Sequence, residues 1–206
     1  MQIARALLVV AVLAAWNAHS GALARAFQLR GLPIRALDLL VYLGVVAVGC
    51  VWLGKRSLPE LGWRFSGFWR LLAAGLLQTA LLVGLVFLVY AALGGLAGVR
   101  GLATAIATMP LSERTAYLVL GVKVAFVEET VFRGDLLGRL SERSGVFVGV
   151  VLSSLVFALY HRTLAPVPFA MKAVLGVVFA LFTLRTRSLL PSAIGHWWLW
   201  VIVGDN

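Results

Sequence analysis

Charged residues are scarce in this chain. They make up 13% of its 206 residues, and only eight of them are Asp or Glu, whereas soluble domains carry roughly 25% charged residues. Hydrophobic residues account for 62% of the chain. This composition excludes an ordinary soluble domain and predicts an integral membrane protein whose surroundings are the lipid bilayer.

Cysteine is nearly absent as well. Cys50 is the single one, so the chain can form no internal disulfide and has no CxxC pair for zinc. Its place within an apolar run predicts a small buried hydrophobic side chain. The net charge of +10 does not indicate nucleic acid as a partner, because the Lys and Arg residues are spread among short connections between apolar runs.

Long apolar runs dominate what remains. They predict an all-α, polytopic transmembrane helix bundle forming one membrane domain over residues 1–206, in the cell (inner or plasma) membrane. Residues 21–24 resemble the end of a secretory signal, so the first run is either retained, as we favour, or cleaved to leave six spans. The Gly- and Ala-rich residues 94–109 fit an interfacial or a re-entrant segment. About seven spans are expected, at residues 3–18, 37–53, 69–93, 115–140, 146–160, 169–184 and 189–203.

Two adjacent carboxylates stand inside the fourth of these runs. An acidic side chain at the centre of a membrane helix costs roughly 2.5 to 3.5 kcal/mol, so Glu128 and Glu129 need partners or a function. Glu129 precedes Arg133 by four residues, which is the favourable order for an ion pair on a helix, while Glu128 is turned about 100° away. The alternative is one structural polar cluster containing all three side chains.

Two histidines lie in later spans. His161 ends the fifth and His196 lies within the seventh. A carboxylate such as Glu128 beside a neutral imidazole can activate water, and a second imidazole can stabilise an oxyanion. The same three groups could instead hold a divalent metal with an open water position. Because two His closely flanking a Glu are absent, we expect no cofactor, with zinc as the second possibility.

These residues fall into a spaced set of motifs. They resemble the motifs of the CAAX-protease and bacteriocin-processing (CPBP, or Abi) family of intramembrane proteases, over roughly residues 111–203. Order and spacing both agree with that family. The matching positions are Glu128-Glu129-xxx-Arg133 for EExxxR, Phe157-xxx-His161 for FxxxH, and His196 for the third motif.

The resemblance implies a role for each residue. Glu128 and His161 would activate the attacking water, His196 would hold the oxyanion, and Glu129 with Arg133 would support the helix that carries Glu128. The family has Asn or Asp four residues after its third-motif histidine, and this chain has Trp200 there. Either another donor, such as Ser192 one turn before His196, serves the oxyanion, or activity is reduced or lost.

The function predicted from these observations is that of a hydrolase: an intramembrane glutamic endopeptidase that cleaves a peptide bond near the membrane in a membrane-anchored or lipidated substrate. Trp200 leaves open a non-catalytic membrane protein that binds a peptide for immunity. Buried Glu and His side chains would also suit a zinc-dependent membrane protease, or a small transporter or proton relay. The transporter hypothesis is not supported, because the sequence contains no paired, interrupted half-repeats.

Overall fold

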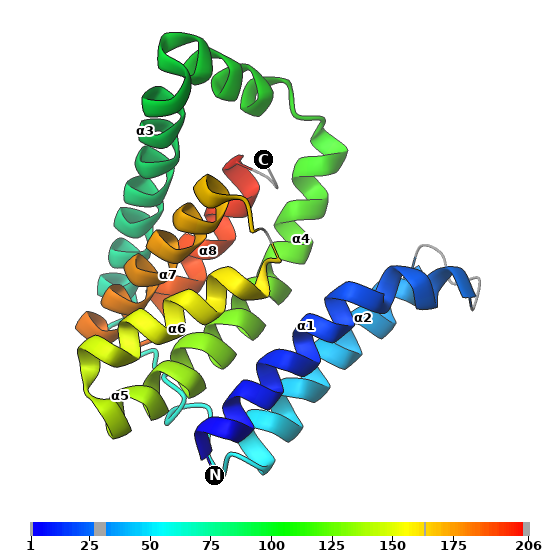
Figure 1. The fold of residues 1–206 in the computed structure, drawn as a ribbon, viewed down its shortest axis with the longest axis vertical. Coiled ribbons are helices and arrows are strands. Elements are labelled where there is room, and N and C mark those ends of the chain that lie inside the picture. Colours follow the sequence, from blue (N-terminus) through cyan, green and yellow to red (C-terminus); the bar gives the residue numbers. More distant parts are fainter. Residues whose placement is uncertain (1, 27–31, 163, 204–206) are drawn as a thin grey trace. The chain divides into compact units, whose positions relative to one another are not determined.

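The computed structural model describes residues 2–26, 32–162 and 164–203. Every regular element within these ranges is a helix, which confirms the predicted all-α membrane helix bundle (Figure 1). Two of the helices, η1 and η2, are π-helices. In chain order the elements are α1 (Gln2–Ala26), α2 (Leu32–Val45), η1 (Val46–Trp52), α3 (Phe68–Thr108), α4 (Leu111–Glu128), η2 (Glu129–Leu137), α5 (Gly138–Ser144), α6 (Val146–Tyr160), α7 (Pro166–Thr186) and α8 (Leu190–Val203).

Several of these helices are apolar enough to enter a bilayer. Gln2–Ala22, Phe68–Thr108 and Pro166–Thr186 are also long enough to cross one. Shorter apolar helices cover Leu37–Trp52, Val146–Tyr160 and Leu190–Val203. Many large apolar side chains are exposed, as expected for helix faces that contact lipid rather than water. The chain is therefore a membrane protein.

The helix α3 extends beyond its predicted span. Residues 94–109, which fitted an interfacial or a re-entrant segment, continue it as helix up to Thr108. Gly95 interrupts the helical geometry with φ 55° and ψ −147°, a conformation that a residue without Cβ adopts at little cost. The helix changes direction there (Figure 1).

The chain forms two compact units, described separately below. Unit 1 comprises Met1–Trp63 and Val127–Val177. In it α1 packs against α2, η1 and η2, and α6 packs against η2 and α5 (Figure 1). The buried Asp135 carboxylate anchors α1, because it accepts hydrogen bonds from Arg5 at 2.7 and 2.8 Å and from Arg139 at 2.7 Å. The N-terminal helix is thus an integral part of this unit.

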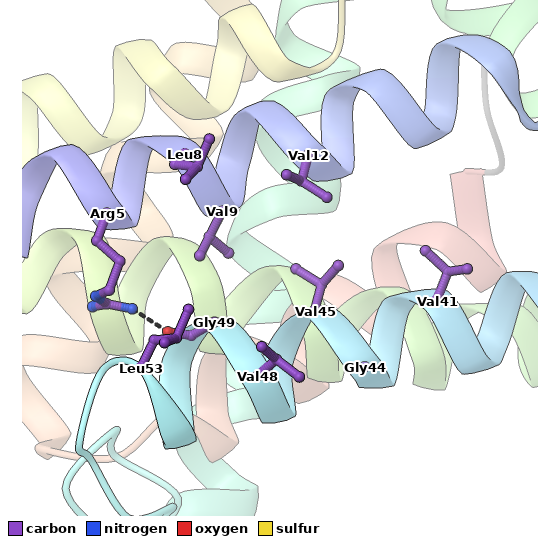
Figure 2. A pocket seen from close by; sticks show the side chains of 10 residues that line it. All are labelled: Arg5, Leu8, Val9, Val12, Val41, Gly44, Val45, Val48, Gly49 and Leu53. Carbon is purple, nitrogen blue, oxygen red and sulfur yellow. Dashed lines mark hydrogen bonds between the residues drawn. The ribbon is translucent and has the colours of Figure 1, made fainter.

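An apolar groove of about 310 Å³ lies between α1 and the α2–η1 segment of unit 1 (Figure 2). Arg5 lies at one end of it and donates a hydrogen bond to the carbonyl of Gly49. The other lining residues are Val, Leu or Gly. None of the residues predicted to form the site lines this groove.

Unit 2 comprises Arg64–Phe126 and Val178–Asn206. Its main contact is between α3 and α8. Glycines let the two helices approach closely: a Cβ added to Gly75 would lie 2.7 Å from the Cβ of Ile194, and one added to Gly195 would lie 3.1 Å from the Cδ of Gln78. Small residues at such crossings are typical of helix packing in membranes.

Candidate active site

The two adjacent carboxylates stand where the helix changes its hydrogen-bonding pattern. The sequence predicts one continuous helix over residues 115–140, and α4, η2 and α5 follow one another without interruption from Leu111 to Ser144. Glu128 is the last residue of α4, and Glu129 begins the π-helix η2. π-Helical turns are rare and occur frequently at functional sites. Hydrophobic periodicity does not reveal this change.

Glu129 and Arg133 form the ion pair that their spacing predicts. The Nη1 atom of Arg133 lies 3.4 Å from Oε1 of Glu129, and both side chains are buried. The Arg133 guanidinium also lies over the Phe157 ring, 4.1 Å from its centroid, which adds a cation–π contact. This arrangement fixes η2 against α6.

His161 directly follows the last residue of α6 and is held in one orientation. Its Nδ1 atom lies 2.8 Å from the backbone carbonyl oxygen of Phe157. Because a carbonyl oxygen only accepts, we assign the proton of the neutral ring to Nδ1, which leaves a lone pair on Nε2. That Nε2 atom lies 3.8 Å from Oε2 of Glu128. The structure therefore brings together, within unit 1, the glutamate and the first histidine predicted from the sequence.

Aromatic rings pack beside the His161 imidazole. The Phe157 ring contacts the His161 ring at a centroid distance of 4.5 Å, and the Phe132 ring meets that of Phe157 edge-on at 5.2 Å. Phe157 thus touches both Arg133 and His161. The phenylalanine of the FxxxH pattern acts here as a packing surface between the ion pair and the imidazole.

The third predicted group, His196, lies on α8 in unit 2. Its imidazole stacks on the Phe179 ring, with centroids 4.8 Å apart and an angle of 29° between the planes. Ser192, one turn earlier, donates its hydroxyl proton to the Phe179 carbonyl at 2.9 Å and lies 2.9 Å from the Thr183 hydroxyl. The Trp200 ring packs edge-on against Tyr117, at a centroid distance of 5.6 Å. Ser192 and Trp200 therefore both make packing or hydrogen-bonding contacts within unit 2.

Comparison with known proteins bears on the same segment. Residues 110–202 match the family model described as "Type II CAAX prenyl endopeptidase Rce1-like". This segment is therefore similar to the CAAX-protease family. The matched range contains every site residue predicted from the sequence, from Glu128 to Trp200. No curated protein and no solved structure matches the chain.

Residues outside the matched segment also contact it, and they are not among the site residues predicted from the sequence. The Trp63 indole donates to the Thr130 hydroxyl at 2.8 Å, next to the ion pair. The Asn17 amide donates to the Tyr160 hydroxyl at 2.5 Å, and the Tyr160 ring lies 5.3 Å from that of His161. Asn17 is an amide in an apolar helix, so the rule that drew attention to the glutamates could have found it.

Potential metal ligands form no cluster of three in the part of the chain that the structure describes. Within residues 2–26, 32–162 and 164–203, no three His, Cys, Asp or Glu side chains lie close enough together to hold a metal ion. In unit 1 the Glu128 carboxylate and the His161 imidazole would supply two ligands of a catalytic zinc, which usually has three from the protein.

Proposed function

We propose that this chain is a glutamic intramembrane endopeptidase that hydrolyses a peptide bond near the membrane. The observation that carries the proposal is the Nε2 atom of His161, which faces the Glu128 carboxylate at 3.8 Å while its Nδ1 is held by the Phe157 carbonyl. This separation exceeds a direct hydrogen bond and suits one water molecule bonded to both groups. A buried carboxylate and a partly exposed imidazole that share a water can act together as a general base.

In the proposed reaction the Glu128–His161 pair removes a proton from the water as its oxygen attacks the carbonyl carbon of the substrate. The carbonyl oxygen gains negative charge and needs a hydrogen-bond donor, the role that the resemblance to the family assigns to His196. The pair then returns the proton to the departing amine as the C–N bond breaks, so the water is divided between the two products. Glu129 and Arg133 keep η2 and its preceding Glu128 in place.

The family that residues 110–202 match is described as a prenyl endopeptidase, which supports a lipidated C-terminal peptide as the substrate class. We further propose that the protein crosses the cell membrane several times, acts on a membrane-anchored or lipidated protein, and uses no metal cofactor. The apolar helices and their exposed apolar faces support this placement.

Glu128→Gln tests the proposal directly. We expect the variant to cleave at least about 100-fold more slowly, because the general base is lost while the shape of the side chain is kept. Turnover would be measured on detergent-purified protein with a farnesylated CAAX-type peptide and a non-lipidated transmembrane peptide. Glu142→Gln is the matched control, since Glu142 is 66% exposed and pairs with Arg56 in unit 1. Equal turnover in wild type and Glu128→Gln would refute the assignment, and binding without cleavage by the wild type would favour the peptide-binding alternative.

The absence of a metal cofactor is tested separately. We expect less than one zinc ion per chain by elemental analysis and unchanged turnover after dialysis against a chelator. A tightly bound metal in a one-to-one ratio, lost together with activity in His161→Ala, would favour the zinc protease instead.

A further inference from the structure

The apolar groove of unit 1 has no part in the proposed reaction. It lies between α1 and the α2–η1 segment and has a volume of about 310 Å³ (Figure 2), at the lower end of the range for ligand pockets. Apart from Arg5, its lining residues are Val, Leu or Gly. Such a lining has no polar group that could orient a polar ligand along the groove. The groove therefore suits a hydrocarbon chain.

Glycines on the α2–η1 side shape the groove. A Cβ added to Gly49 would lie 2.6 Å from Cγ2 of Val9, so the two helices meet closely at this point. A Cβ added to Gly44 would meet no atom within 4 Å. On the opposite wall, Leu8 is 63% exposed and Val12 is 45% exposed. The groove is therefore open to the surrounding bilayer beside these residues.

One end of the groove lies at the membrane interface. The helix α1 begins at Gln2, and η1 ends at Trp52, so both apolar segments have an end there. Arg5 and Leu53 line the groove at this end (Figure 2). Trp52 is 72% exposed, as is typical of tryptophan in the aromatic belt of a bilayer. From Arg5 to Val12 the groove runs about 10 Å along α1, away from the interface.

The interfacial end of the groove carries excess positive charge. Arg5 and Arg139 both donate to the Asp135 carboxylate, so two guanidinium groups share one negative charge. The Arg5 side chain remains 13% exposed. Lys55, two residues after Leu53, is exposed and has no ion-pair partner among residues 2–26, 32–162 and 164–203. An anionic group at this end would therefore meet complementary charge.

The other carboxylates of this region have partners of their own. Glu142 pairs with Arg56 at 2.6 Å, and Glu60 accepts hydrogen bonds from the backbone N–H and the hydroxyl of Ser57, both at 2.7 Å. Basic pockets between membrane helices bind the headgroups of anionic lipids. Because the charge lies at the interface and the apolar lining extends inward from it, the two features match the two parts of a phospholipid.

We propose that this groove binds one acyl chain of an anionic phospholipid whose phosphate lies at the Arg5 end. Arg5 and Lys55 face the phosphate, and the chain runs along α1 past Val12. The bound chain fills the space between α1 and the α2–η1 segment, and so stabilises unit 1. None of the residues predicted to form the active site lines the groove, and the inference does not depend on the endopeptidase function.

The headgroup is tested with two lipids on the full chain, purified in detergent and washed free of lipid. Palmitoyl-oleoyl phosphatidylglycerol and palmitoyl-oleoyl phosphatidylcholine share their chains and differ in net charge. Native mass spectrometry would count the lipids bound per chain and measure their affinities. One basic side chain favours an anionic lipid by about 5-fold, so phosphatidylglycerol should bind at least about 5-fold more tightly. Lys55→Gln should lose most of this preference and still bind both lipids.

The place of the chain is tested by filling the groove. Gly44→Phe and Val12→Phe each add a ring, from opposite walls. Each should weaken binding of phosphatidylglycerol by at least about 10-fold, the cost of uncovering two methylene groups. Gly84→Phe on α3 is the matched control, because a Cβ there also meets nothing within 4 Å. It should bind phosphatidylglycerol as the wild type does. Unfolding temperatures without added lipid would show that each variant is folded.

Three results would overturn the inference. The first is equal affinity of the wild type for the two lipids, and the second is wild-type binding in both groove-filling variants. The third is displacement of phosphatidylglycerol by a farnesylated peptide, which would assign the groove to the lipid of the substrate. Glu128→Gln should bind phosphatidylglycerol as the wild type does, so loss of the endopeptidase assignment would leave the lipid site standing.

Discussion

At the scale of single residues, two chemically identical neighbours differ because of what each one faces. Glu129 pairs with Arg133 at 3.4 Å, whereas Glu128 faces His161 at 3.8 Å. The first contact pairs a carboxylate with a guanidinium in a buried setting, and the second pairs a carboxylate with an imidazole. We therefore expect loss of Glu129 to affect mainly stability and loss of Glu128 to affect mainly turnover.

Glu129→Gln should lower the free energy of unfolding by about 3–5 kcal/mol, because it removes the counter-charge of the buried Arg133. Thermal unfolding in detergent, followed by tryptophan fluorescence, would measure the change. The double variant Glu129→Gln/Arg133→Met is the matched control. It should recover part of the loss, since replacing both members of a buried pair leaves no isolated charge. A single variant as stable as the wild type would contradict a supporting role for the pair.

At the scale of helices, packing in unit 2 depends on close approach between α3 and α8. Gly75 meets Ile194 on one turn, and Gln78 meets Gly195 on the next. Close approach of this kind gives membrane helices van der Waals contact that burial of apolar surface from water cannot supply within lipid. It also holds the turn that carries His196 in a defined position against α3.

Gly75→Ala should destabilise unit 2 by about 1–3 kcal/mol, the usual cost of overpacking, because the new Cβ would lie 2.7 Å from the Cβ of Ile194. Gly84→Ala on the same helix is the control. A Cβ there meets nothing within 4 Å, and alanine favours the helix by up to about 1 kcal/mol. Relative to wild type, the unfolding temperature should therefore fall in Gly75→Ala and rise in Gly84→Ala. Equal shifts would show that the α3–α8 contact does not depend on the glycine.

At the scale of the whole molecule, parts of the chain far apart in sequence hold the fold of unit 1 together. Arg5 near the N-terminus reaches Asp135 in η2, and Arg139 shares the same carboxylate. The Trp63–Thr130 and Asn17–Tyr160 hydrogen bonds add two more such connections. The segment outside the family match thus stabilises the matched segment that carries Glu128 and His161.

Asp135→Asn should cost about 3–5 kcal/mol of unfolding free energy, because it removes the one carboxylate bonded to both Arg5 and Arg139 in a buried position. Glu142→Gln, which breaks the more exposed pair with Arg56, should change stability by at most about 1 kcal/mol. Chemical denaturation in mixed micelles would compare the two variants. A loss in Asp135→Asn no larger than that in Glu142→Gln would mean that the Asp135 carboxylate does not anchor α1.

The sequence by itself determined the features that depend on local patterns. Apolar run length predicted the membrane helices, since a bilayer requires a minimum number of apolar residues. Helical spacing placed Glu129 beside Arg133, and the motifs pointed to the same family whose model matches residues 110–202.

Only the tertiary structure decided which faces of these helices meet. It turned Glu128 toward His161, set a π-helix at Glu129, joined Arg5 to Asp135, and left the Gln78 amide buried against Gly195. Hydrophobic periodicity carries little information on these points, because in a membrane helix both the lipid-facing and the inward-facing sides are apolar. The surroundings of a lone amide such as Asn17 or Gln78 are therefore set by packing between segments far apart in the chain, which local sequence does not encode.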